Sequence, residues 1–140
     1  MNVKKYIEKK TELVNVDCPL THTFSEGVYH REIFMPKGTF IIGHKHNTTH
    51  LNIISKGRAK VWMDGIVEVI EAPYTFESKA GVRKILFIEE DMLWATVHVT
   101  SETDIETLEN MLVDKHSADT LTLDDIKKIV KEDLLCQWHG

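Results

Sequence analysis

Between residues 29 and 99, apolar and polar residues alternate with the period of two that β-strands show, and turn-forming residues interrupt the pattern at short intervals. Pro36 and Gly38 break the chain, as does Lys56-Gly57, and Asp64-Gly65 is typical of a two-residue hairpin. The pattern predicts strands at Tyr29 to Met35, Phe40 to His46, Leu51 to Ser55, Arg58 to Met63, Ile66 to Glu71, Tyr74 to Ser78, Lys84 to Glu89 and Leu93 to Val99. Several short strands with such punctuation favour a β-barrel or jelly roll.

Helical spacing of apolar residues occurs at both ends of the chain. Residues 3–10 have a helical period but are too few to be stable unless they dock on the rest of the protein. Two capping boxes, Thr103 with Glu106 and Thr122 with Asp125, each open an apolar stripe. The sequence therefore predicts a short N-terminal helix, a helix over about 104–113 and a second C-terminal helix after residue 122.

Length and composition indicate one soluble domain. A chain of 140 residues, 42% hydrophobic and 28% charged, has the size and composition of a single globular domain. We expect a mostly β (α+β) domain over residues 1–140, with the barrel at about 24–100 and a helical extension at about 101–140.

Charge and hydropathy limit the kinds of binding partner and the cellular compartments that the sequence favours. The net charge of −5 argues against a nucleic-acid partner, which would normally meet a basic face. No apolar run is long enough to span a bilayer and the N-terminus lacks the apolar centre of a signal peptide, so we expect no membrane association and a cytoplasmic location. Cys18 and Cys136 show no paired spacing and are expected to be free thiols.

Three histidines in seven residues, His44, His46 and His50, are the strongest chemical signal. On a strand, side chains at i and i+2 share a face, and His50 keeps the same parity if the chain stays extended. Neutral imidazole is the commonest metal ligand, so we expect these residues to bind one divalent metal ion. The alternative is a barrel without metal in which the histidines act as hydrogen-bonding groups.

A glycine frame surrounds the histidines. Five residues separate Gly38 from His44, one separates His44 from His46, three separate His46 from His50, and six separate His50 from Gly57. This spacing resembles the first motif of the cupin superfamily, with His50 where the family usually has a glutamate ligand. The resemblance implies a cupin-type double-stranded β-helix, that is, a jelly-roll barrel.

The second cupin motif is weaker, and it places basic residues near the expected site. Gly81-Val-Arg83-Lys84 matches its glycine-x-x-histidine step, with Lys84 in the place of the usual histidine. An unperturbed lysine, with its pKa near 10.4, is a poor metal ligand. Arg83 and Lys84 are instead candidates to bind a carboxylate or phosphate, and the alternative is a solvated strand end.

Further candidates lie on the last predicted strand and on an earlier one. Trp94, Thr96 and His98 share one face of the strand, although parity does not decide whether that face lines the barrel. If it does, His98 is a candidate metal ligand or substrate contact, and Trp94 could stack against a ligand or belong to the core. Tyr74 is a further candidate ligand contact, acid or base.

About half of the chain, from Gly43 to Glu109, also resembles the small cupin-like proteins that tailed bacteriophages encode. The residues behind this resemblance are Gly43 to His46, His50 to Gly57, Asp64-Gly65, Ala72 to Phe76, Gly81 to Lys84, Glu90 to His98 and Thr103-Asp104. It implies a phage protein in the host cytoplasm and supplies no substrate.

We therefore expect a metal-binding cupin that acts on, or binds, a small anionic molecule in its barrel. An all-histidine site suits Zn, Fe, Mn or Ni, and the sequence leaves open whether the protein is an enzyme and which residues would be catalytic. The alternatives are a non-catalytic protein that sequesters a small molecule or nucleotide, and a dimeric accessory protein with a structural metal. We expect a homodimer, because sheet edges need cover and the last predicted helix has a broad apolar stripe.

Overall fold

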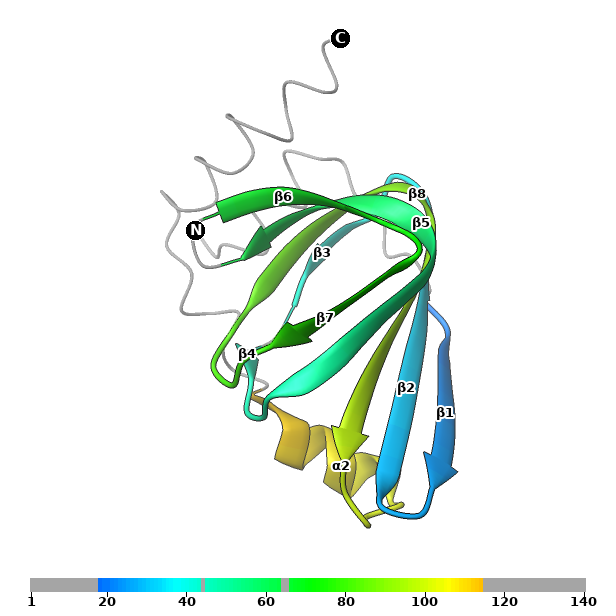
Figure 1. Cartoon of the computed structure of the whole chain (residues 1–140), viewed down its shortest axis with the longest axis vertical. Helices are drawn as coiled ribbons and strands as arrows, with labels where there is room; N and C mark the ends of the chain where they lie inside the picture. Colours follow the sequence, from blue (N-terminus) through cyan, green and yellow to red (C-terminus); the bar gives the residue numbers. More distant parts are fainter. Residues whose placement is uncertain (1–17, 44, 64–65, 115–140) are drawn as a thin grey trace, which may run out of the picture.

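The computed structural model describes residues 18–43, 45–63 and 66–114 as a curled antiparallel sheet with one short helix at one end (Figure 1). The elements are β1 (Leu20–Ser25), β2 (Val28–Met35), β3 (Phe40–Ile42), β4 (Lys45–His46), β5 (His50–Met63), β6 (Ile66–Glu71), β7 (Tyr74–Ser78), β8 (Lys84–Val99), α2 (Ile105–Leu112) and β9 (Val113–Asp114). The predicted helices at 3–10 and after residue 122, and the Asp64-Gly65 turn, lie outside the described residues.

Two long strands organise the sheet. Its strands follow the order β1-β2-β8-β5-β6, with β3 paired to β8 and β7 paired to β5, and β4 pairs separately with β9. The second half of β8 and the first half of β5 lie with β1, β2 and β7, whereas the other halves lie with β3 and β6. Because β5 and β8 take part in both groups, the sheet closes over itself as two facing layers, which is a jelly-roll arrangement.

The bend between the layers explains why the sequence predicted four strands where the structure has two. The register of β5 against β8 shifts between Ile54 and Ala59, as it does at β-bulges. Gly57 has a φ of +96°, and a Cβ atom there would lie 2.4 Å from the carbonyl oxygen of Asp91. The predicted break at Lys56-Gly57 is therefore wrong: glycine bends a continuous strand there and permits close approach of β8.

Other boundaries agree with the prediction or differ for simple reasons. The bounds of β6 and β7 are as predicted, and β2 begins one residue early. The predicted strand Phe40 to His46 is split into β3 and β4. Strand β1 was not predicted, because this edge strand is exposed along most of its length and lacks a clear alternation.

The predicted helix at 104–113 is confirmed as α2. The predicted capping box of Thr103 with Glu106 is wrong: the N-cap is Asp104, whose carboxylate accepts hydrogen bonds from the backbone N–H and the hydroxyl of Thr107. Leu108 and Leu112 pack against Tyr29 of β2, so the helix lies at one end of the sheet (Figure 1). Among the described residues α2 is the only helix, so the number of helices in the chain stays a prediction.

The main apolar core fills the space between the two layers. It consists of Met35, Ile54, Ala59, Val61, Ile70, Leu86, Ile88, Met92 and Trp94. Cys18 packs against this core. The core holds together the half of the barrel away from α2 and so fixes the long strands whose other ends form the site.

Candidate functional site

Three histidines meet at the end of the barrel near α2. His46 belongs to β4, His50 begins β5 and His98 is the penultimate residue of β8. The ring centroids of His46 and His50 are 4.5 Å apart, and those of His50 and His98 are 5.0 Å apart. His50 and His98 become neighbours because the register pairs the adjacent Leu51 with Val97.

These positions settle the parity of β8 and leave one predicted ligand untested. Trp94, Thr96 and His98 are all buried, at 4%, 9% and 3% exposure, so their face of β8 is the inner face. His50 is 4% exposed. His44 lies outside the described residues, so its predicted place beside His46 stays a prediction.

Each of the three histidines has a buried ring nitrogen without a hydrogen-bond partner among the described residues. These atoms are His46 Nδ1, His50 Nε2 and His98 Nδ1. His50 Nδ1 lies 2.9 Å from the carbonyl oxygen of Thr48. A carbonyl only accepts hydrogen bonds, so Nδ1 carries the proton and Nε2 presents a lone pair. His98 Nε2 lies 2.9 Å from Thr96 Oγ1, and because a hydroxyl both donates and accepts, this hydrogen bond allows either tautomer of His98.

The surroundings keep all three imidazoles neutral. Burial, together with the positive charge of Lys84, lowers the pKa of His46 to about 3. Burial and the neighbouring His50 lower the pKa of His98 to about 4, and burial also lowers the pKa of His50. Neutral imidazole is the form that binds metals, so near neutral pH the rings are in the state that a metal site needs.

The ring orientations are nevertheless not those of a closed metal site. Within the described residues, no three His, Cys, Asp or Glu side chains are placed so that they could hold a metal ion together. The His46 and His50 rings are stacked, with 29° between their planes, so their lone pairs do not converge on one point. The three imidazoles and their unpartnered nitrogens are suitable metal ligands, but their rings would have to rotate before the nitrogens could bind one ion together.

Two adjoining cavities open beside the histidines. The larger, of about 530 Å³, is lined by His46 and His98 and reaches Glu109 and Leu112 of α2. The smaller, of about 110 Å³, lies toward the apolar core. Their shared walls are formed by Arg31, Ile33, Ile41, Gly43, His46 and Thr96.

Arg31 is the cavity residue that the sequence reasoning missed. Arg31 is an even number of residues from the buried Tyr29 and Met35 on β2, so its side chain lies on the same, inward face of the strand as theirs. The same parity argument that grouped Trp94 with His98 would have found it. The Arg31 guanidinium also donates a hydrogen bond to the Tyr29 hydroxyl, and this hydroxyl lies within hydrogen-bond distance, 2.6 Å, of His22 Nδ1 on β1.

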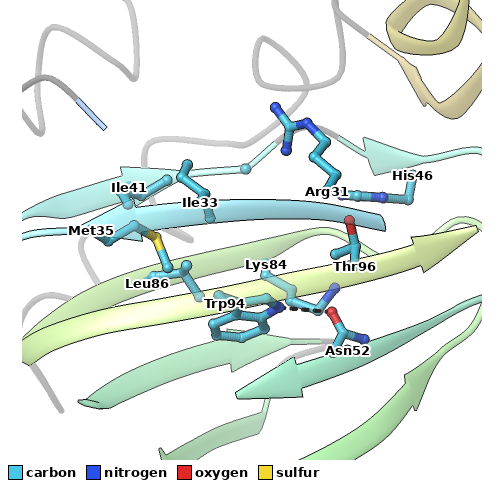
Figure 2. Close-up of a pocket in the computed structure, with 11 residues that line it drawn as sticks. Arg31, Ile33, Met35, Ile41, His46, Asn52, Lys84, Leu86, Trp94 and Thr96 are labelled. Atoms are coloured by element: carbon cyan, nitrogen blue, oxygen red, sulfur yellow. Dashed lines mark hydrogen bonds between the residues drawn. The ribbon is translucent and has the colours of Figure 1, made fainter. Parts of the chain in front are cut away.

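Lys84 lines the smaller cavity, and its predicted role in binding an anion stays a prediction. It is 8% exposed, and Figure 2 places it with Asn52 and Trp94 below Arg31. Arg83, the other predicted basic residue, is not among the described residues that line either cavity.

Trp94 has a double role and Tyr74 lies elsewhere. The Trp94 Nε1–H donates to Asn52 Oδ1 at 2.9 Å (Figure 2), and Asn52 Nδ2 in turn donates to Ser78 Oγ at 2.8 Å. Trp94 therefore belongs to the core and also forms part of the cavity wall. Tyr74 is 47% exposed on β7, stacks on Phe76, and is not among the residues that line the two cavities.

Comparison with known proteins places the fold. The structure is similar to an RmlC-like cupin family protein with a double-stranded β-helix fold from Methanocaldococcus jannaschii, with a TM-score of 0.52 and 16% identity over 61% of this chain and 82% of the other. It is also similar to KdgF from Halomonas sp., with a TM-score of 0.54 and 13% identity over 66% of this chain and 87% of the other. An acetylacetone dioxygenase from Acinetobacter johnsonii gives a TM-score of 0.51 and 14% identity over 61% of each chain. The chain has a cupin fold.

The comparisons go no further than the fold. No family model matches the sequence, and a search of curated proteins also gives no match. The resemblance to phage proteins therefore stays a prediction. No helix in the described part of the chain is long and apolar enough to cross a membrane.

Proposed function

We propose that the protein binds one divalent metal ion at the end of its barrel and holds a small anionic molecule beside it. The observation that carries this proposal is the set of adjoining, buried and unpartnered nitrogens of His46, His50 and His98. A buried polar atom without a partner costs roughly 1–3 kcal/mol, and a metal ion would satisfy all three at once. His44, from the same sequence motif, would be a fourth ligand.

The stacked rings are compatible with this role. The χ2 torsion of histidine is broad, so an imidazole can turn about its Cβ–Cγ bond at small cost. An all-nitrogen donor set suits Zn, Fe, Mn or Ni. Such an ion, when bound, acts as a Lewis acid or acidifies a bound water.

The charge of the cavity supports an anionic ligand. Arg31 and Lys84 both line the smaller cavity, and none of its described lining residues is a carboxylate. We therefore propose Arg31, in place of Arg83, as the arginine that binds the anion. In the larger cavity, Glu109 is the single acid among the described lining residues.

The space beside the histidines favours a ligand-binding or enzymatic role over a purely structural metal. A metal that only stabilised the barrel would need no room around it, whereas a cavity of about 530 Å³ is within the ~300–1,000 Å³ range of small-molecule sites. A metal-dependent enzyme is the second candidate, because the acetylacetone dioxygenase has the same fold and such a cavity admits a substrate.

Metal titration tests the proposal. Protein stripped with a chelator is titrated by calorimetry with Zn²⁺, Mn²⁺, Ni²⁺ and, without oxygen, Fe²⁺. We expect one ion per chain and at least tenfold weaker binding in His46→Ala, His50→Ala and His98→Ala. His30→Ala is the matched control, because His30 also has a buried ring nitrogen without a described partner but lies on the opposite face of β2 from Arg31. Unchanged binding in all three variants would overturn the proposal.

A homodimer remains part of the proposal. Leu51 and Val99 are 45% and 94% exposed on the neighbouring strands β5 and β8 and support an apolar contact on this side of the sheet. Light scattering at micromolar concentration tests it: twice the chain mass of 16.1 kDa is expected, and the mass of one chain would contradict it.

A further inference from the structure

The two cations of the smaller cavity come from opposite layers of the barrel. Arg31 lies on β2, and Lys84 begins β8 in the part of that strand that pairs with the end of β5. Both lie near the histidines, since each contributes to lowering the pKa of His46 and of His98. Both side chains line this cavity, so an anionic group bound there is attracted by positive charge from both layers, although the Arg31 guanidinium points away from Lys84 in Figure 2.

The remaining walls of this cavity are mainly apolar. Ile33, Met35, Ile41, Leu86 and Trp94 line it, and Met35, Leu86 and Trp94 are at most 7% exposed. A second anionic group placed against these side chains would lose its hydration without gaining a partner, which is unfavourable. The cavity is thus suited to a ligand with one charged end and one apolar end.

Its size sets a further limit. About 110 Å³ is well below the ~300 Å³ at which sites for drug-sized ligands begin. A short aliphatic acid fits within this cavity alone, whereas a nucleotide or a sugar phosphate would have to extend into the larger cavity that adjoins it.

We propose that this cavity selects a small organic monocarboxylate, with its carboxylate between Arg31 and Lys84 and its apolar chain against Met35, Leu86 and Trp94. This inference names the ligand class of the anion site proposed above and rests on that proposal. It does not depend on a bound metal, because neither cation is one of the proposed metal ligands.

The test is a matched series of ligands, titrated against both the metal-free and the metal-loaded protein. Butanoate has one carboxylate and an apolar chain, succinate has the same four carbons with two carboxylates, and butanamide has the same chain without charge. Inorganic phosphate probes simple attraction of an anion. Acetate has the carboxylate with almost no apolar chain. We expect butanoate to bind at least tenfold more tightly than succinate, butanamide, phosphate and acetate, with or without metal.

Variants assign the contacts. Arg31→Gln and Lys84→Met should each weaken butanoate binding at least tenfold, with circular dichroism confirming the fold. Lys79→Gln is the control, because the Lys79 side chain is 76% exposed and pairs with Glu77 instead. If Lys84→Met fails to fold, Arg31→Gln still decides the question. Equal or tighter binding of succinate or phosphate would overturn the inference, as would butanoate binding that is absent or unchanged in the folded variants. Loss of metal binding with retained butanoate selectivity would overturn only the metal proposal.

Discussion

The two ends of the barrel, one at the bend of β5 and β8 and the other near α2, are almost equally buried but serve opposite purposes. At the end away from α2, Ile88 and Met92 are fully buried among other apolar side chains. At the end near α2, His50 and His98 are 4% and 3% exposed, yet each has a buried nitrogen without a described partner. Burial of apolar groups stabilises a fold, whereas burial of unpaired polar groups costs free energy. The apolar end therefore holds the strands in place, and its stability offsets the cost of burying the histidine nitrogens that we propose as metal ligands.

The largest expected effect comes from the apolar end. Ile88→Ala removes a side chain with 0% exposure from the main core, so the free energy of unfolding should fall by about 2–5 kcal/mol. Urea denaturation measures the loss. The folded fraction should still bind metal with wild-type affinity, because Ile88 lines neither described cavity. A loss below ~1 kcal/mol would show that this end does not carry the stability assigned to it.

Elements of the fold could be predicted from the sequence where a pattern of neighbouring residues determines them, and could not where contacts between distant residues do. The alternation in β6 and β7 and the spacing of the α2 stripe are local, and these elements were placed correctly. The bulge at Gly57 is not local, since it depends on how closely Asp91 approaches from a distant strand. Strand β1 has no apolar face of its own to reveal it.

The same limit applies to the site. The spacing of His46 and His50 is visible in the sequence, but their meeting with His98 depends on the register of β5 against β8. Parity along β2 could have indicated Arg31. The positions of Arg83 and Tyr74 away from the two cavities depend on where each strand meets the cavity, which one sequence does not reveal.

Acid should lower the free energy of unfolding of the metal-free protein, by an amount between the largest and the smallest effects predicted here. Folding holds the pKa of His46 at about 3 and that of His98 at about 4, below the ordinary value of 6.5. Below pH ~6.5 the unfolded chain therefore binds more protons than the folded one, so metal-free protein is fully stabilised above that pH and loses stability as the pH falls toward 4. The loss should approach about 1.4 kcal/mol per pH unit for each histidine.

Chemical denaturation of chelator-treated protein at pH 7.5 and pH 5 checks this pH dependence. The variant that combines His46→Leu with His98→Leu should lose less stability between these two pH values than the wild type does. Equal losses in the two proteins would mean that other groups cause the acid sensitivity.

The smallest expected effect is that of a single histidine on the metal-free fold. His98→Leu replaces a buried ring with an unpartnered nitrogen by an apolar side chain of roughly similar size. The free energy of unfolding without metal should stay within ~1 kcal/mol of the wild-type value or rise, since no satisfied polar network is broken beyond the bond to Thr96. Thermal unfolding with and without chelator compares the proteins. A loss as large as that in Ile88→Ala would remove the distinction between the two ends.

The central claim is that the histidine end of the barrel is a metal site. Anomalous X-ray scattering, measured above and below the absorption edge of the bound metal in crystals of the reconstituted protein, tests it most directly. With zinc, the account predicts one anomalous peak at about 2.0–2.1 Å from nitrogen atoms of His46, His50 and His98. The absence of a peak there, or a peak bound by other residues, would contradict it.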